Sequence, residues 1–139
     1  MRRILFDTNI ILDVLLDRQP HAEASAALWA RVEIGDAEGM VSGLALTTIH
    51  YLIRRDIGSA KANRVVAELM KVFQVAPVTA GVIQEALALP FSDFEDAVTA
   101  AAARSAGCDY VVTRDTKGFR GSPLPCFAPD AMAPLLGQS

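Results

Sequence analysis

Short apolar runs that alternate with segments of helical periodicity constrain the fold of this chain more than any other feature. The first run, residues 3–6, stops at Asp7, and apolar residues then recur at helical spacing from Ile10 to Leu15. Further runs predict strands at residues 39–42, 72–78, 109–113 and 125–127. Helices are expected at about residues 8–17, 20–35, 44–55, 59–70, 79–89, 92–107 and 131–136. This alternation predicts βαβ units, and therefore a parallel sheet covered by helices on both faces.

Length and composition are those of a compact globule. The chain has 139 residues, of which 52% are hydrophobic and 21% charged, so we expect one continuous domain over residues 1–139. No run approaches the ~20 apolar residues of a membrane span, and Cys108 and Cys126 share no metal-ligand spacing. We therefore expect a cytoplasmic protein with reduced thiols and no membrane contact.

The net charge of −3 argues against a chain held to nucleic acid by a strong positive field. It does not exclude a nuclease, because a cluster of metal-binding acids itself lowers the net charge. The placement of individual charges therefore matters more than their sum.

Four aspartates are expected at one edge of the sheet. Asp7 follows the first strand, and Asp115 lies two residues beyond the strand at 109–113. Asp93 and Asp96 open the helix that leads into that strand, and its N-terminus points to the same edge because the helix runs antiparallel to the strand. Open parallel sheets bind ligands at this edge. Hard oxygen ligands of this kind bind Mg²⁺ or Mn²⁺, which can activate water and neutralise charge at a phosphate.

Several segments, taken in order, carry a resemblance to a known family. Residues 7–13 (Asp-Thr-Asn-Ile-Ile-Leu-Asp), Ser42 before a helix, residues 94–97 (Phe-Glu-Asp-Ala) and residues 109–115 (Asp-Tyr-Val-Val-Thr-Arg-Asp), followed by Phe119, resemble the PIN-domain nucleases, which include VapC-like toxins. The resemblance covers nearly the whole chain. It implies a three-layer α/β/α fold, whose central sheet would be mainly parallel with four to five strands.

The same resemblance implies Mg²⁺- or Mn²⁺-dependent endonucleolytic cleavage of single-stranded RNA. Asp7, Asp96 and Asp115 match the metal-site acids of the family by position, so they are the expected catalytic residues and metal ligands. The resemblance also implies homodimers and, for toxins, an antitoxin protein that binds across the acidic groove. RNA, a second copy of the chain and an antitoxin are therefore the expected partners.

One position departs from the family pattern. Many PIN nucleases place a Glu six residues past the Ser that follows the second strand, and this chain has Thr48 there. A hydroxyl can bind a metal-bound water but adds no negative charge. Asp93 shares a helix face with Asp96 and is a fourth candidate metal ligand that could partly compensate. The supporting residues of the site are expected to be Thr8, Asn9, Thr48 and Thr113.

Each acid also has a purely structural interpretation. Asp7 could cap the first helix, and Asp115 could stabilise a turn. Ser92 and Glu95 have the spacing of a capping box, which favours a structural role for Glu95. Asp93 and Asp96 also suit a helix N-terminus through the helix dipole, and for Asp96 the family resemblance favours the functional role.

Charged residues around these acids are open to two interpretations as well. Arg114, Lys117 and Arg120 could bind substrate by steering a phosphate backbone to the acids, or could form an ordinary solvated surface. Asp13, six residues after Asp7, is expected on the solvated face of the first helix.

Three functions are compatible with these residues. The first is a metal-dependent endoribonuclease, including the toxin of a type II toxin–antitoxin pair. The second is a non-catalytic RNA- or protein-binding module with a degraded metal site, which is motivated by Thr48. The third is a phosphatase-type enzyme with Asp7 as nucleophile, although such enzymes carry Asp-x-Asp and this chain has Asp-x-Asn.

Overall fold

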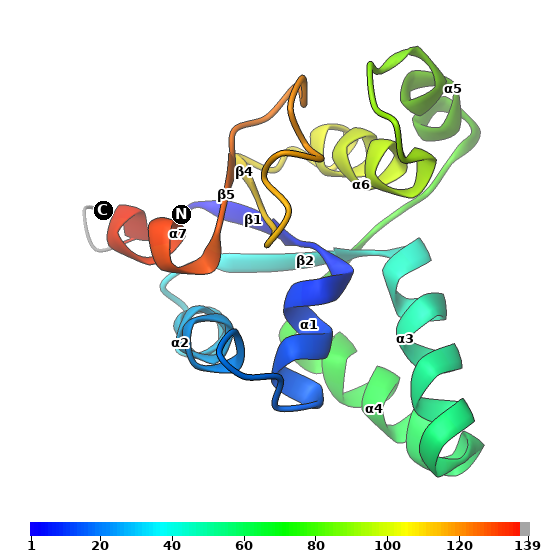
Figure 1. Cartoon of the computed structure of the whole chain (residues 1–139), viewed down its shortest axis with the longest axis vertical. Helices are drawn as coiled ribbons and strands as arrows, with labels where there is room; N and C mark the ends of the chain where they lie inside the picture. Colours follow the sequence, from blue (N-terminus) through cyan, green and yellow to red (C-terminus); the bar gives the residue numbers. More distant parts are fainter. Residues whose placement is uncertain (137–139) are drawn as a thin grey trace.

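The computed structural model describes residues 1–136 and contains a five-stranded sheet in which every strand pair is parallel (Figure 1). The strands are β1 (Arg3–Phe6), β2 (Glu38–Ser42), β3 (Gln74–Ala76), β4 (Tyr110–Val112) and β5 (Cys126–Phe127). The helices are α1 (Thr8–Leu15), α2 (Ala22–Glu33), α3 (Gly43–Ile57), α4 (Ser59–Val72), α5 (Ala80–Ala88), α6 (Phe94–Ser105) and α7 (Pro129–Leu136). The strand order β3-β2-β1-β4-β5 places β1 at the centre.

Side chains of the strands alternate between two buried layers, because successive residues of a strand point to opposite faces. Ile4 and Phe6 of β1 pack in a cluster with α1, α2, α3, α4 and α7. Leu5, between them, packs in a second cluster with α5 and α6. Figure 1 shows α5 and α6 on one side of the sheet and α1 to α4 on the other. The expected three-layer α/β/α fold with a parallel central sheet is confirmed.

Small residues let the layers approach closely. In α6, Ala100, Ala101, Ala102 and Ala103 are fully buried. On β2, a Cβ atom added to Gly39 would lie 2.6 Å from the ring of Phe73, which leaves no room for a side chain. That ring stacks edge-on against Phe6 and Trp29, each with centroids 5.0 Å away. Trp29 is therefore half-buried and packs against the cluster that contains Ile4 and Phe6.

Several boundaries differ from the sequence-based expectation. The strand expected at residues 72–78 is only Gln74–Ala76, because α4 continues to Val72. The last helix begins at Pro129 and contains Pro134, so it is longer than expected at its start. No helix within residues 1–136 combines the length and apolarity needed to cross a membrane.

Candidate active site

Asp7 is fixed in place from both sides of its carboxylate. It is the N-cap of α1, where Oδ1 accepts the backbone N–H of Thr8 at 2.8 Å, and Oδ2 accepts the hydroxyl of Thr113 at 2.8 Å. The residue is only 7% exposed. Burial raises the pKa of Asp7, the hydrogen bonds from Thr113 and Thr8 oppose that rise, and the charges of Glu95 and Asp115 add to it. Asp7 thus both caps α1 and contributes its carboxylate to the candidate site.

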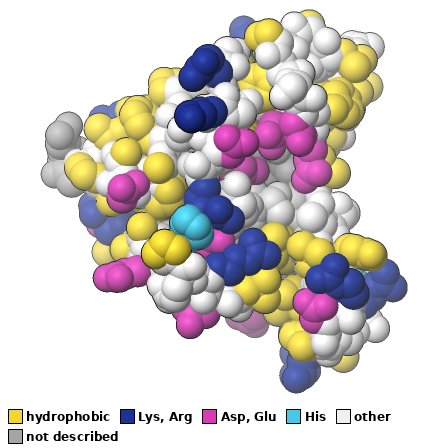
Figure 2. Space-filling model, viewed as in Figure 1, with side chains coloured by type: hydrophobic (Ala, Val, Ile, Leu, Met, Phe, Trp, Pro, Cys, Tyr) yellow, Lys and Arg dark blue, Asp and Glu magenta, His cyan; other side chains and the backbone are white. Residues whose placement is uncertain are grey.

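Asp96 lies in the first turn of α6 and is surrounded by negative charge. Its pKa is raised to about 7, first by burial and then by the carboxylates of Asp7, Asp93, Asp115 and Glu95. Carboxylates that raise each other's pKa lie within electrostatic reach of one another. The acids that the sequence analysis assigned to one edge are therefore electrostatically coupled in the structure. Figure 2 shows acidic side chains gathered on the face beneath α5 and α6, where the surface is hollowed.

Asp115 follows β4 in a turn that holds both its backbone and its side chain. Its N–H donates to the hydroxyl of Thr113 at 3.1 Å, and its Oδ1 accepts the N–H of Gly118 at 3.0 Å. A Cβ atom on residue 118 would lie 2.4 Å from Asp115 Oδ2, so glycine leaves the space that this carboxylate occupies. Thr113 itself is fully buried and connects Asp115 to Asp7.

The N-terminus of α6 is built differently from the expected capping box. Asp93, not Ser92, is the N-cap, and its Oδ1 accepts the N–H of Asp96 at 3.1 Å. The cap prediction at Ser92 is therefore wrong. Glu95, which that pattern assigned to the cap, contributes instead to the raised pKa of both Asp7 and Asp96. Glu95 was not predicted as a member of the acidic group, because its spacing from Ser92 offered a structural explanation.

The other expected supporting residues differ in their surroundings. The Thr48 hydroxyl donates within its own helix to the carbonyl of Leu44 at 3.3 Å. Asn9 Oδ1 is buried and has no hydrogen-bond partner within the described residues. Thr8 contributes its backbone N–H to Asp7 rather than its side chain.

The basic residues near Asp115 divide into two groups. Arg114, Lys117 and Arg120 are all exposed. Arg114 also donates from Nε to Oδ2 of Asp13 at 2.6 Å. Asp13 is fully buried, so the expectation of a solvated side chain is wrong. Helical periodicity alone could not reveal this, because the basic partner lies 101 residues away in sequence.

The donor chemistry of the site fits a hard divalent cation. Asp7, Asp96 and Asp115 supply only oxygen donors, Glu95 adds charge, and the buried Asn9 Oδ1 is an unsatisfied oxygen near the start of α1. Within residues 1–136, no three Asp, Glu, His or Cys side chains are already arranged closely enough to hold an ion.

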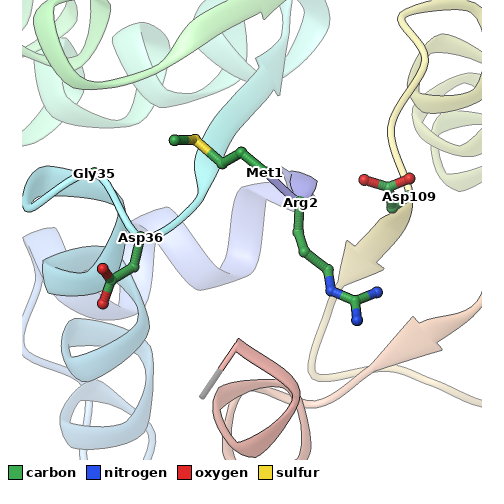
Figure 3. Close-up of a pocket in the computed structure, with 5 residues that line it drawn as sticks. All are labelled: Met1, Arg2, Gly35, Asp36 and Asp109. Carbon is green, nitrogen blue, oxygen red and sulfur yellow. The ribbon is translucent and has the colours of Figure 1, made fainter. Parts of the chain in front are cut away.

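A second hollow lies at the opposite edge of the sheet. It is lined by Met1, Arg2, Gly35, Asp36 and Asp109, which come just before β1, β2 and β4 (Figure 3). Its residues are thus at the amino ends of strands, and the acidic group is at the carboxyl ends. This hollow takes no part in the candidate site.

Comparison with known proteins identifies the family. The chain matches the PIN domain over residues 3–117. No curated protein matches it in sequence.

Its fold is similar to that of several solved structures. VapBC2 from Rickettsia felis bound to a promoter DNA fragment gives a TM-score of 0.70 at 13% identity over 91% of this chain and 98% of the other. FitAcB from Neisseria gonorrhoeae gives a TM-score of 0.68 at 22% identity, over 91% of this chain and 97% of the other. Mycobacterium tuberculosis VapC20, described as a sarcin–ricin loop cleaving toxin, gives a TM-score of 0.62 at 23% identity, over 78% of this chain and 86% of the other. These likenesses establish the fold, and because the family match spans most of the sequence, the chain belongs to the PIN-domain family.

Proposed function

We propose that this chain is a metal-dependent endoribonuclease that cleaves single-stranded RNA with Mg²⁺ or Mn²⁺. The observation that supports the proposal is the electrostatic coupling of Asp7, Asp96 and Asp115, expressed in a pKa of about 7 at Asp96. Uncompensated carboxylates would repel both one another and a phosphate backbone, whereas a divalent cation would attract all of them. Membership of the PIN-domain family also supports a nuclease function.

The three aspartates would hold the cation, and neighbouring residues would keep them oriented. When bound, the cation supplies an activated water and charge neutralisation at the scissile phosphate. Thr113 orients Asp7 through its hydroxyl, and Gly118 orients Asp115 through its backbone N–H. Asp96 must lose its proton before it can act as a ligand. The exposed Lys117 and Arg120 are placed on the same turn as Asp115 and would bind adjacent phosphates.

Replacement of Asp7 by Asn tests the proposal. With labelled single-stranded RNA and Mn²⁺, the wild-type chain should give products with 5′-phosphate and 3′-hydroxyl ends. Asp7→Asn should lower the cleavage rate at least about 100-fold, the usual scale for losing a central electrostatic group of an active site. Asp36→Asn, an exposed carboxylate beside the opposite edge of the sheet, is the matched control and should cleave normally. Wild-type cleavage by Asp7→Asn would contradict the mechanism.

We further propose that the chain is the toxin of a type II toxin–antitoxin pair, cytoplasmic and homodimeric. The support is the likeness of its fold to VapBC2 and FitAcB. Expression of the chain alone should arrest bacterial growth, and co-expression with the product of the adjacent gene should restore growth and yield a stable complex. Equal growth with and without the chain, at confirmed expression of active nuclease, would contradict the toxin role. Sedimentation of the purified chain tests the dimer.

Thr48 supports a second candidate function, a non-catalytic PIN-like module that binds RNA or protein. Its hydroxyl is bonded to its own helix and adds no charge to the acidic group. Calorimetric titration with Mn²⁺ separates the two candidates. Saturable binding at millimolar metal or below favours the nuclease, and retained RNA binding without any metal binding favours the module.

A further inference from the structure

An ion pair between the buried Asp13 and the partly exposed Arg114 joins α1 to the turn that carries Asp115. Asp13, in α1, is fully buried, and its Oδ2 accepts Nε of Arg114 at 2.6 Å. Oδ1 of the same carboxylate has no hydrogen bond within the described residues, and the guanidinium of Arg18 lies 3.9 Å from it. Arg114 is therefore the main partner of a carboxylate that solvent does not reach.

An ion pair that buries one of its two charges contributes little net stability to a fold. Desolvation of the Asp13 carboxylate offsets much of its attraction to Arg114, whose side chain is 31% exposed. An apolar side chain of similar size in place of such a carboxylate often stabilises a core as well or better. Such a pair does, however, fix geometry, because a short charge-assisted hydrogen bond tolerates little displacement. The position of Arg114 shows which geometry is fixed here.

Arg114 lies between two residues of the acidic site. Thr113 donates its hydroxyl to Asp7, and Asp115 donates its backbone N–H to the oxygen of that same hydroxyl. The segment from Thr113 to Asp115 thus contacts the first helix twice, at Asp7 through Thr113 and at Asp13 through Arg114. These two contacts lie six positions apart on the first helix and set both the location and the direction of the segment.

We propose that Asp13 is a positioning residue, which holds Arg114 and thereby fixes Asp115 relative to Asp7. The inference rests on the proposed function, because it assigns the pair a purpose in the carboxylate site. It also assigns Arg114 to the framework of the site rather than to RNA. Phosphate contacts near Asp115 then fall to Lys117 and Arg120, because the guanidinium of Arg114 is engaged by Asp13.

Three variants test the pair: Asp13→Asn, Arg114→Gln and the double variant. Partners that orient metal ligands typically contribute 10- to 100-fold to metal affinity or activity. We expect each single variant to weaken Mn²⁺ binding and to lower kcat about 10-fold or more, with KM for RNA nearly unchanged. The double variant should be no worse than either single one, because each removes the same contact. Amide hydrogen exchange should accelerate at Asp115 and Gly118 without metal or RNA present.

Glu38→Gln is the matched control, since it breaks an ion pair with Arg3 of similar length, 2.7 Å, at the opposite edge of the sheet. It should change neither Mn²⁺ affinity nor exchange at Asp115. Arg114→Lys keeps a positive charge beside Asp13, so it should fold and recover part of the lost affinity even where Arg114→Gln does not fold.

Two results would overturn the inference. One is exchange at Asp115 that is unchanged in both Asp13→Asn and Arg114→Lys. The other is a higher KM for RNA in the Arg114 variants with normal metal affinity, which would make Arg114 a substrate residue. A wild-type chain that binds Mn²⁺ but cleaves no RNA would reject the proposed function and still leave the exchange and affinity measurements to decide the role of Asp13.

Discussion

At the scale of single residues, Asp96 links the acidic site to the stability of the fold. Its pKa is raised to about 7 by burial and by neighbouring carboxylates, whereas an unfolded chain releases this proton near pH 4. The folded chain therefore binds more protons than the unfolded chain between these two values, and its stability falls as pH rises through that window. The stabilising contribution is complete below about pH 4 and lost above about pH 7.

We predict that Asp96→Asn stabilises the metal-free chain at pH 8 but not at pH 4. The gain in free energy of unfolding should be ~1–2 kcal/mol, which is less than the full pKa shift implies because the side chain is partly exposed to solvent. Denaturant unfolding in the presence of a chelator at both pH values measures it. Asp36→Asn, away from the acidic group, should show no such gain at pH 8. The prediction would be contradicted if Asp96→Asn changed the free energy of unfolding by the same amount at both pH values.

At the scale of secondary structure, local patterns predicted the elements better than the contacts between them. The bounds of β1, β2 and β4 were predicted to within one residue, because a buried parallel strand is apolar along its length. The start of α6 was misplaced because Ser92 and Asp93 are both good caps and only the folded backbone selects one. The burial of Asp13 was missed because its partner Arg114 is distant in sequence.

The cap of α6 leads to a prediction that distinguishes the capping role of Asp93 from the contribution of its charge. Asp93→Asn keeps a side-chain oxygen for the N–H of Asp96, so its stability should be close to that of the wild-type chain. Asp93→Ala removes that acceptor and should lose about 1 kcal/mol of stability. Thermal unfolding compares the two variants, and their Mn²⁺ affinities show whether the charge of Asp93 also contributes to metal binding. Equal destabilisation by Asn and Ala would exclude a capping role.

At the scale of the whole molecule, the sheet order brings together acids from distant parts of the chain. With β1 between β2 and β4, Asp7 and Asp115 follow neighbouring strands. The sequence predicted that Asp7 and Asp115 lie close together, because parallel strands present their carboxyl ends at one edge of the sheet. It could not predict the hydrogen bond from Thr113 to Asp7, which depends on the register of Phe6 opposite Val112.

Metal binding should therefore stabilise the chain as a whole, because the unfolded chain cannot assemble the acidic group. At a Mn²⁺ concentration 100-fold above the dissociation constant, mass action adds ~2.7 kcal/mol, which corresponds to a rise in Tm of roughly 5–10 °C. Calorimetry of the wild-type chain measures this rise, and Asp7→Asn should show little of it. A similar rise in Asp7→Asn would indicate that the ion binds elsewhere.

The central position of β1 also bears on how the chain is synthesised. β4, which supplies Thr113 as the hydroxyl donor to Asp7, begins only at Tyr110. A fragment that ends before that point would have β1 as an edge strand, and its Asp7 would lack the carboxylate of Asp115 and the hydroxyl of Thr113. Premature termination or proteolytic loss of the segment that carries Asp115 would thus leave the acidic group incomplete, and this group could form only after that segment has been translated.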